Sequence, residues 1–117
     1  MDINAPDAWQ RAIKPNTKVF YAESISNPLL EVAPFGPLIE FARAHGLLTM
    51  VDNTVATPVN FRPASVGFDL ILHSASKYLS GHTNVVAGVV AGRGEAVDQT
   101  RKLMNLSGVC LAPHSCH

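Results

Sequence analysis

The chain has 117 residues, a formal net charge of zero at pH 7, and a composition of 47% hydrophobic and 15% charged residues. This length suits one small domain of an ordinary globular protein. The sequence has neither the clustered basic face of a nucleic-acid-binding protein nor the roughly 20 consecutive apolar residues of a membrane span, so we expect no nucleic-acid or membrane partner. It has no secretory signal pattern and only two cysteines, Cys110 and Cys116, which predicts a cytoplasmic protein with reduced thiols.

The first part of the chain predicts a helix, a strand and a second helix. Apolar spacing around Trp9 predicts a short helix with Asp7 as its N-cap. The β-branched and aromatic residues of 18–23 predict a strand. A proline near the start and Gly46 just past the end predict a helix over residues 37–44.

The rest of the chain predicts three more strands and a final helix. Residues 47–51 and 68–73 are apolar enough to be strands of a buried sheet, and residues 57–67 connect them through a loop and a short helical turn. Residues 85–91 predict a fourth strand of undecided direction, followed by a helix over 94–106. This order predicts an α/β fold with a mainly parallel sheet.

Two features predict that the chain is a piece of a longer protein. It stops at His117 without a helix cap or a polar tail. Four strands with few helices would also leave an edge strand and apolar surface exposed. A fragment or a strongly self-associating chain is therefore expected.

A candidate site arises where two strands end. Asp52 closes one apolar strand, and Lys77 follows the next. In open α/β sheets, ligands bind outside the carboxyl ends of the strands, so both side chains are expected at one edge. A buried carboxylate needs a cation or N–H donors. Asp52 is therefore either the cap of a turn through Thr54 or an acid that holds a protonated ring nitrogen of a cofactor.

The segment around Lys77 carries hydroxyl groups. Ser74 and Ser76 are spaced so that both hydroxyls can face one phosphate, although plain loop serines are the simpler interpretation. Lys77 could be a solvent-exposed lysine, a point charge for a phosphate, or an amine that forms a Schiff base. The glycine pattern of a nucleotide P-loop is missing.

The remaining candidates are weaker. Asn27 precedes Pro28 and suits an Asx-turn, which does not exclude a second role for its side chain. The histidines and cysteines near the end of the chain lack zinc-site spacing, so no metal is expected. A Ser-His-Asp hydrolase is not supported either, because no G-x-S-x-G turn is present.

Three stretches together point to a known family. Residues 23–32 read ESISNPLLEV, residues 51–58 read VDNTVATP, and residues 73–82 read HSASKYLSGH. In order and spacing they resemble the pyridoxal-phosphate-dependent Cys/Met metabolism family of trans-sulfuration enzymes, which includes cystathionine γ-synthase, cystathionine γ-lyase, methionine γ-lyase and the O-acylhomoserine sulfhydrylases. The resemblance implies that residues 1–117 are part of the large cofactor-binding domain of a fold-type-I, aspartate-aminotransferase-like enzyme.

The resemblance also implies roles for individual residues. Lys77 looks like the lysine that carries pyridoxal 5'-phosphate as a Schiff base, and Asp52 like the acid on its pyridine nitrogen. Ser74 and Ser76 match the hydroxyls on the phosphate, although the family more often has threonine at the second place. Asn27 matches the amide beside the ring oxygen and the substrate carboxylate. Thr54 is expected near the ring. Glu23 is expected at most behind the residues that contact the cofactor.

The implied reaction is β- or γ-elimination or replacement on a sulfur amino acid or an activated homoserine, in a cytoplasmic homo-oligomer that binds a small amino-acid substrate. Two differences from the family bear on this: Ile25 stands where proline is common, and the segments that precede and follow this part of the family's enzymes are missing. The competing hypothesis is a catalytically inactive fragment or degenerate paralogue that binds at most the cofactor or a subunit. An unrelated α/β binding module would require the three stretches to coincide by chance.

Overall fold

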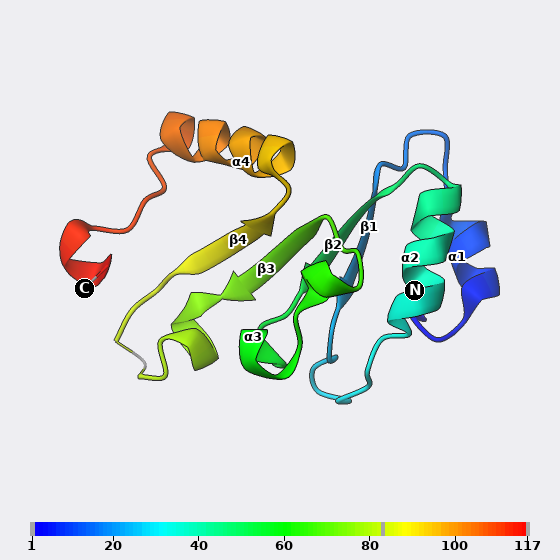
Figure 1. Ribbon diagram of the computed structural model, residues 1–117, viewed down its shortest axis with the longest axis horizontal. Helices are drawn as coiled ribbons and strands as arrows, with labels where there is room; N and C mark the ends of the chain where they lie inside the picture. The colour runs from blue at the N-terminus through cyan, green and yellow to red at the C-terminus, as the bar shows by residue number, and fades with distance from the viewer. Residues whose placement is uncertain (1, 83, 117) are drawn as a thin grey trace.

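The described residues, 2–82 and 84–116, fold around a four-stranded sheet in this computed structural model (Figure 1). The strands lie in the order β1-β2-β3-β4; the first three are parallel and the fourth is antiparallel to β3. Their bounds are β1 Val19–Glu23, β2 Leu48–Asp52, β3 Leu70–Ser74 and β4 Gly88–Gly92. The mainly parallel α/β sheet predicted from the sequence is confirmed.

The helices follow the predicted order, with two differences at their starts. Asp7 is not the N-cap of the first helix: Ala5 occupies that position without a side-chain hydrogen bond, and Asp7 lies in the first turn, where its charge suits the helix dipole. The second helix begins at Phe35 and not at Pro37. Proline is tolerated throughout the first turn of a helix, so its position does not fix the first helical residue. The helical segments are α1 Pro6–Ala12, α2 Phe35–Ala44, α3 Thr57–Asn60, η1 Pro63–Ser65, η2 Ala75–Leu79, α4 Gly94–Ser107 and η3 Pro113–Cys116.

One face of the sheet carries the hydrophobic core. Side chains alternate along β1, so that Phe20 and Ala22 are buried while their neighbours are exposed. The Trp9 ring packs edge-on against Phe20 and Phe41, with centroids 5.4 and 5.5 Å apart. Helices α1 and α2 therefore cover the sheet at β1 and β2 (Figure 1).

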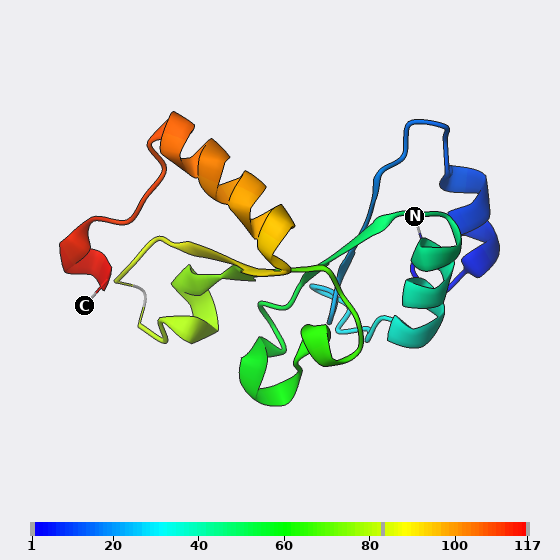
Figure 2. The ribbon, with the colours of Figure 1, turned by 45° about the horizontal axis from the view of Figure 1, so that its top comes forward.

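The opposite face is largely open. Val19 and Tyr21 of β1 are 40% and 49% exposed. Helix α4 lies on the other side of the sheet from α3 (Figure 2), yet none of its residues is buried. Strands β1 and β4 are both edges. The exposed edge strand and apolar surface predicted from the sequence are thus present in the described part of the chain.

Hydrogen bonds around Asp69 join β2, β3 and β4 at the end of the sheet opposite the predicted site. The Asp69 carboxylate accepts hydrogen bonds from the Thr49 amide at 2.9 Å and from the Thr49 hydroxyl at 2.7 Å. Its backbone oxygen accepts the Arg93 amide at 3.2 Å, and Gly92 packs against that same oxygen. A Cβ atom on Gly92 would overlap the Asp69 carbonyl, so only glycine fits there.

Gly92→Ala is therefore expected to destabilise the fold by about 1–3 kcal/mol, the usual cost of overpacking a site that cannot relax. Urea unfolding followed by circular dichroism measures the loss. Gly94→Ala is the matched control, because a Cβ atom at Gly94 meets nothing within 4 Å. Equal unfolding midpoints for the two variants would contradict this account of Gly92.

Candidate active site

The three parallel strands end side by side on polar residues. Glu23 is the last residue of β1 and pairs in register with Asp52, the last residue of β2. Ser74 ends β3, the next strand along. The predicted carboxyl edge of the sheet therefore collects an acid from each of two strands and a hydroxyl from the third.

A cleft of about 220 Å³ lies at this edge. It is lined by Glu23, Ile25, Asn27, Asp52, Thr54, Val55, Ser74, Lys77 and Tyr78. The structure thus brings together Asn27, Asp52, Thr54, Ser74 and Lys77 of the residues that the sequence singled out. Their roles toward a cofactor stay predictions.

Asp52 forms the turn cap, which was one of the two roles that the sequence left open. Its Oδ1 atom accepts the Thr54 amide at 2.8 Å, which makes it the cap of a turn. Within residues 2–82 and 84–116, its Oδ2 atom makes no hydrogen bond, and the side chain lines the cleft. One carboxylate oxygen therefore holds the turn, and the other is available to a ligand.

Tyr21 lies on the open face next to these acids. Burial first, then the negative charges of Asp52 and Glu23, raise the pKa of the Tyr21 phenol above its usual 10.0. A raised pKa means that the folded state favours the neutral phenol. The stabilisation from this group is therefore complete below pH 10.0 and is lost as the pH rises through the folded-state pKa.

We expect the phenolate absorbance that Tyr21→Phe removes to appear with a midpoint above pH 10.0. Glu23→Gln should move that midpoint down, because it removes one of the two nearby charges. A midpoint at or below 10.0 in the wild-type protein would contradict the proximity of Tyr21 to the carboxylates.

The lysine segment follows β3 directly. Ser74 is the N-cap of η2, and the backbone of Lys77 leaves the helical region within that segment, with φ −99° and ψ −119°. The Lys77 side chain lines the cleft and is exposed at its outer end. This amine therefore borders the same space as the Asp52 carboxylate.

Ser76 lies differently from Ser74. Its hydroxyl accepts the Ala87 amide at 2.8 Å and faces the Ala87 carbonyl oxygen at 3.3 Å. These contacts tie η2 to the segment before β4, and Ser76 does not line the cleft. The predicted contact of Ser76 with a phosphate stays a prediction. In this structure the Ser76 hydroxyl forms hydrogen bonds with the Ala87 backbone.

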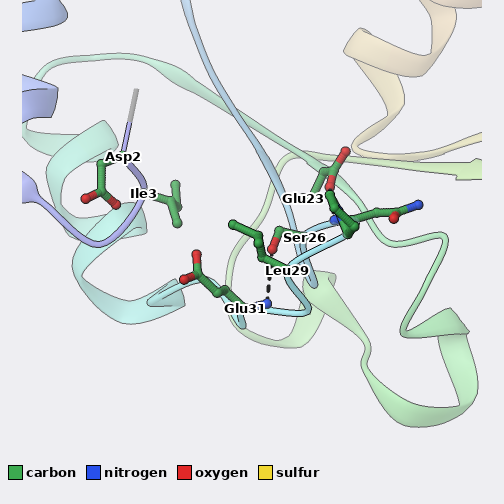
Figure 3. Close-up of a pocket in the computed structure, with 8 residues that line it drawn as sticks. Asp2, Ile3, Glu23, Ser26, Leu29 and Glu31 are labelled. Carbon is green, nitrogen blue, oxygen red and sulfur yellow. Dashed lines mark hydrogen bonds between the residues drawn. The ribbon is translucent and has the colours of Figure 1, made fainter.

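Asn27 reaches the cleft from the loop after β1. Its backbone N–H donates to the Glu23 carboxylate at 3.2 Å. Glu23 and Asn27 also border a second cleft of about 520 Å³, where Figure 3 shows Asp2, Ile3 and Glu31 on one side and Glu23 on the other. The residues lining this second cleft include no lysine, so it offers no amine for a Schiff base.

A buried amide supports the site from behind. Asn53 is fully buried, and its Nδ2 atom donates to the carbonyl oxygens of Thr57 at 3.2 Å and Phe61 at 2.9 Å. Thr57 has a φ of 62°, which is unfavourable for a β-branched residue by about 1–3 kcal/mol. Asn53 therefore holds the strained start of α3 beneath the Asp52 turn.

Sequence reasoning missed two features of the site. Tyr78 lines the cleft beside Lys77, and only its place next to the lysine could have indicated this. The Thr54 hydroxyl accepts the Ser74 amide at 2.8 Å, a contact between residues 20 positions apart that no local pattern predicts. Within residues 2–82 and 84–116, no group of three or more His, Cys, Asp or Glu residues could hold a metal, and no helix is long and apolar enough to cross a membrane.

Comparisons with known proteins identify the family of this chain. A sequence model of the family described as Cys/Met metabolism PLP-dependent enzyme matches residues 1–117. Cystathionine β-lyase of Bacillus subtilis strain 168 is 44% identical over 117 residues, which cover 99% of this chain and 30% of that enzyme. The chain thus spans about a third of the length of the curated relatives that it matches.

Solved structures are similar as well. The crystal structure of cystathionine γ-lyase from Lactobacillus plantarum with L-serine superposes with a TM-score of 0.90 at 39% identity, covering 98% of this chain and 30% of that one. An O-acetylhomoserine (thiol)-lyase from Campylobacter jejuni, solved with a pyridoxyl-lysine phosphate, gives a TM-score of 0.78 at 37% identity over 84% of this chain and 24% of that one. By sequence and by fold, this chain belongs to the Cys/Met metabolism family of PLP-dependent enzymes.

Proposed function

We propose that this chain supplies the lysine and the acid of a pyridoxal-phosphate site that acts on a sulfur amino acid or an activated homoserine by β- or γ-elimination or replacement. One observation carries the proposal: the Lys77 amine and the Asp52 carboxylate line one cleft at the carboxyl edge of the sheet. A membrane or nucleic-acid function has no comparable feature in its favour.

The donor set of the cleft fits the cofactor. An aldehyde needs an amine, which Lys77 provides; a protonated ring nitrogen needs a carboxylate, and the Oδ2 atom of Asp52 is available. A phosphate needs hydroxyl and backbone donors, and Ser74 lies at the start of a helical segment beside the lysine. Pyridoxal phosphate, when bound, supplies an electron sink for the substrate's α-carbon.

Each of these residues then has its own role toward the cofactor. Asp52 keeps the ring nitrogen protonated, because a carboxylate favours the charged form of a neighbouring base. Lys77 carries the cofactor and moves a proton at the substrate. Asn27 and Thr54 orient the ring, and Ser74 holds the phosphate. The Ser76 hydroxyl binds the Ala87 backbone outside the cleft and reaches the phosphate only if that contact breaks. Residues 1–117 act as part of a cofactor domain in a cytoplasmic homo-oligomer.

A second candidate is a catalytically inactive fragment or paralogue. Two observations favour it: Lys77 is exposed, and no residue of α4 is buried. An exposed amine reacts with aldehydes without selection. Selective reaction at Lys77 therefore separates the two candidates.

The test treats the chain with pyridoxal phosphate, reduces it with borohydride, and maps the labelled lysines by mass spectrometry. The chain has four lysines, which serve as internal references for one another: Lys14, Lys18, Lys77 and Lys102. Label concentrated on Lys77 supports the enzyme site. Label spread evenly over all four would sink that proposal and leave the inactive fragment.

A further inference from the structure

Strands β2 and β3 are joined beyond the end of their backbone ladder. The last paired residues are Asp52 and Leu72, after which the Asn53 amide donates to the Leu72 carbonyl at 2.8 Å. The next rung is formed by a side chain: the Thr54 hydroxyl oxygen accepts the Ser74 amide at 2.8 Å. Thr54 thus supplies a side-chain acceptor for a half-buried backbone amide.

Thr54 is also joined to the acid of the site. Its own amide donates to Oδ1 of Asp52 at 2.8 Å. A single residue thus links the carboxylate at the end of β2 with the amide at the end of β3. Because Ser74 is the N-cap of η2, its position sets where Lys77 leaves the segment three residues later.

We propose that Thr54 is a positioning residue that holds the lysine segment in place relative to Asp52. This inference rests on the proposed function and deepens it. The hydroxyl does this work by accepting a hydrogen bond, so its proton is still available to donate into the cleft. A side chain of the same shape without the oxygen, Thr54→Val, removes the link and leaves the volume.

The alternative is that Thr54 merely fills space beside a ring. The two roles differ in which substitution of Thr54 preserves them. Serine keeps the acceptor oxygen and loses only a methyl group, so Thr54→Ser should preserve the link, whereas a space-filling role should tolerate Thr54→Val. Thr17→Val is a matched control, because the Thr17 hydroxyl accepts the Lys14 amide at 2.9 Å in an exposed turn outside the cleft.

The experiment has two readouts on the 117-residue chain. The first is the hydrogen-exchange rate of the Ser74 amide measured by NMR without any cofactor, with the Val51 amide of central strand β2 as an internal reference for global unfolding. The second is the share of borohydride-fixed pyridoxal phosphate found on Lys77. Thr54→Val should raise the exchange of Ser74 about tenfold or more relative to Val51 and lower the Lys77 share toward that of the other lysines.

Thr17→Val should match the wild type in both readouts, and Thr54→Ser should keep the slow exchange of the Ser74 amide. Unchanged Ser74 exchange in Thr54→Val would overturn the link, and faster exchange with an unchanged Lys77 share would overturn the positioning role. If Thr54→Val unfolds, Val51 exchanges faster as well, and Thr54→Ala compared with Thr54→Ser at lower temperature then decides the same question. A wild-type chain that does not favour Lys77 refutes the proposed function instead, while Ser74 exchange still decides the link.

Discussion

Lys77→Ala is expected to remove the label that pyridoxal phosphate and borohydride leave at the cleft, with no other lysine replacing it. Of the four lysines in the chain, Lys77 is the one that lines the cleft with Asp52. Schiff-base formation needs an amine, so the loss should be complete at this position. The measurement is peptide mass spectrometry together with the visible absorbance of the lysine-bound cofactor.

Two variants control this result. Lys77→Arg keeps the positive charge but has no reactive amine, so it should fail in the same way and separate chemistry from charge. Lys102→Ala removes an exposed lysine of α4 and should leave the label at Lys77 unchanged. A Lys77→Ala protein that kept the lysine-linked absorbance would rule out Lys77 as the attachment point.

Asp52→Asn is expected to allow attachment at Lys77 but to lower turnover of a sulfur amino acid by the active protein on the order of a hundredfold or more. Asparagine keeps an Oδ1 atom for the Thr54 amide, so the turn should survive. What is lost is the negative charge that holds a proton on the ring nitrogen. Steady-state kinetics measure the change, and the labelling reaction shows that Lys77 still reacts.

Asp98→Asn is the matched control for this charge removal. Asp98 is an exposed residue of α4 whose carboxylate pairs with Arg101 at 3.0 Å, and an exposed pair of this kind contributes little. Its loss should change turnover by less than twofold in rough terms. Equal turnover in Asp52→Asn and the wild-type protein would count against Asp52 as the ring-nitrogen acid.

Much of the site could be predicted because parallel strands meet at one edge. Asp52 and Ser74 each close a largely apolar run, and β2 and β3 end on these two residues. Once the order of strands and helices predicted a parallel sheet, these ends had to be neighbours. The same reasoning predicted Lys77 at this edge, and both Lys77 and Asp52 line the cleft.

Helix starts were harder to predict, because several residues can satisfy the same local rule. Asp7 has the chemistry of an N-cap but lies inside α1, and Pro37 is compatible with any place in a first turn. Both helices pack on the same core, α1 through Trp9 and α2 through Leu38.

The sequence by itself determined the α/β class, the three strands that end in polar residues, and the family through its three ordered stretches. These depend on local apolar runs and on residue identity, which are present in the chain before it folds. Only the tertiary structure decided that β4 runs antiparallel, that the Ser76 hydroxyl binds the Ala87 backbone, and that Thr54 completes the ladder at Ser74. Each of these depends on hydrogen bonds between residues that are apart in the sequence, and the partners are set by how the strands come together rather than by neighbouring residues.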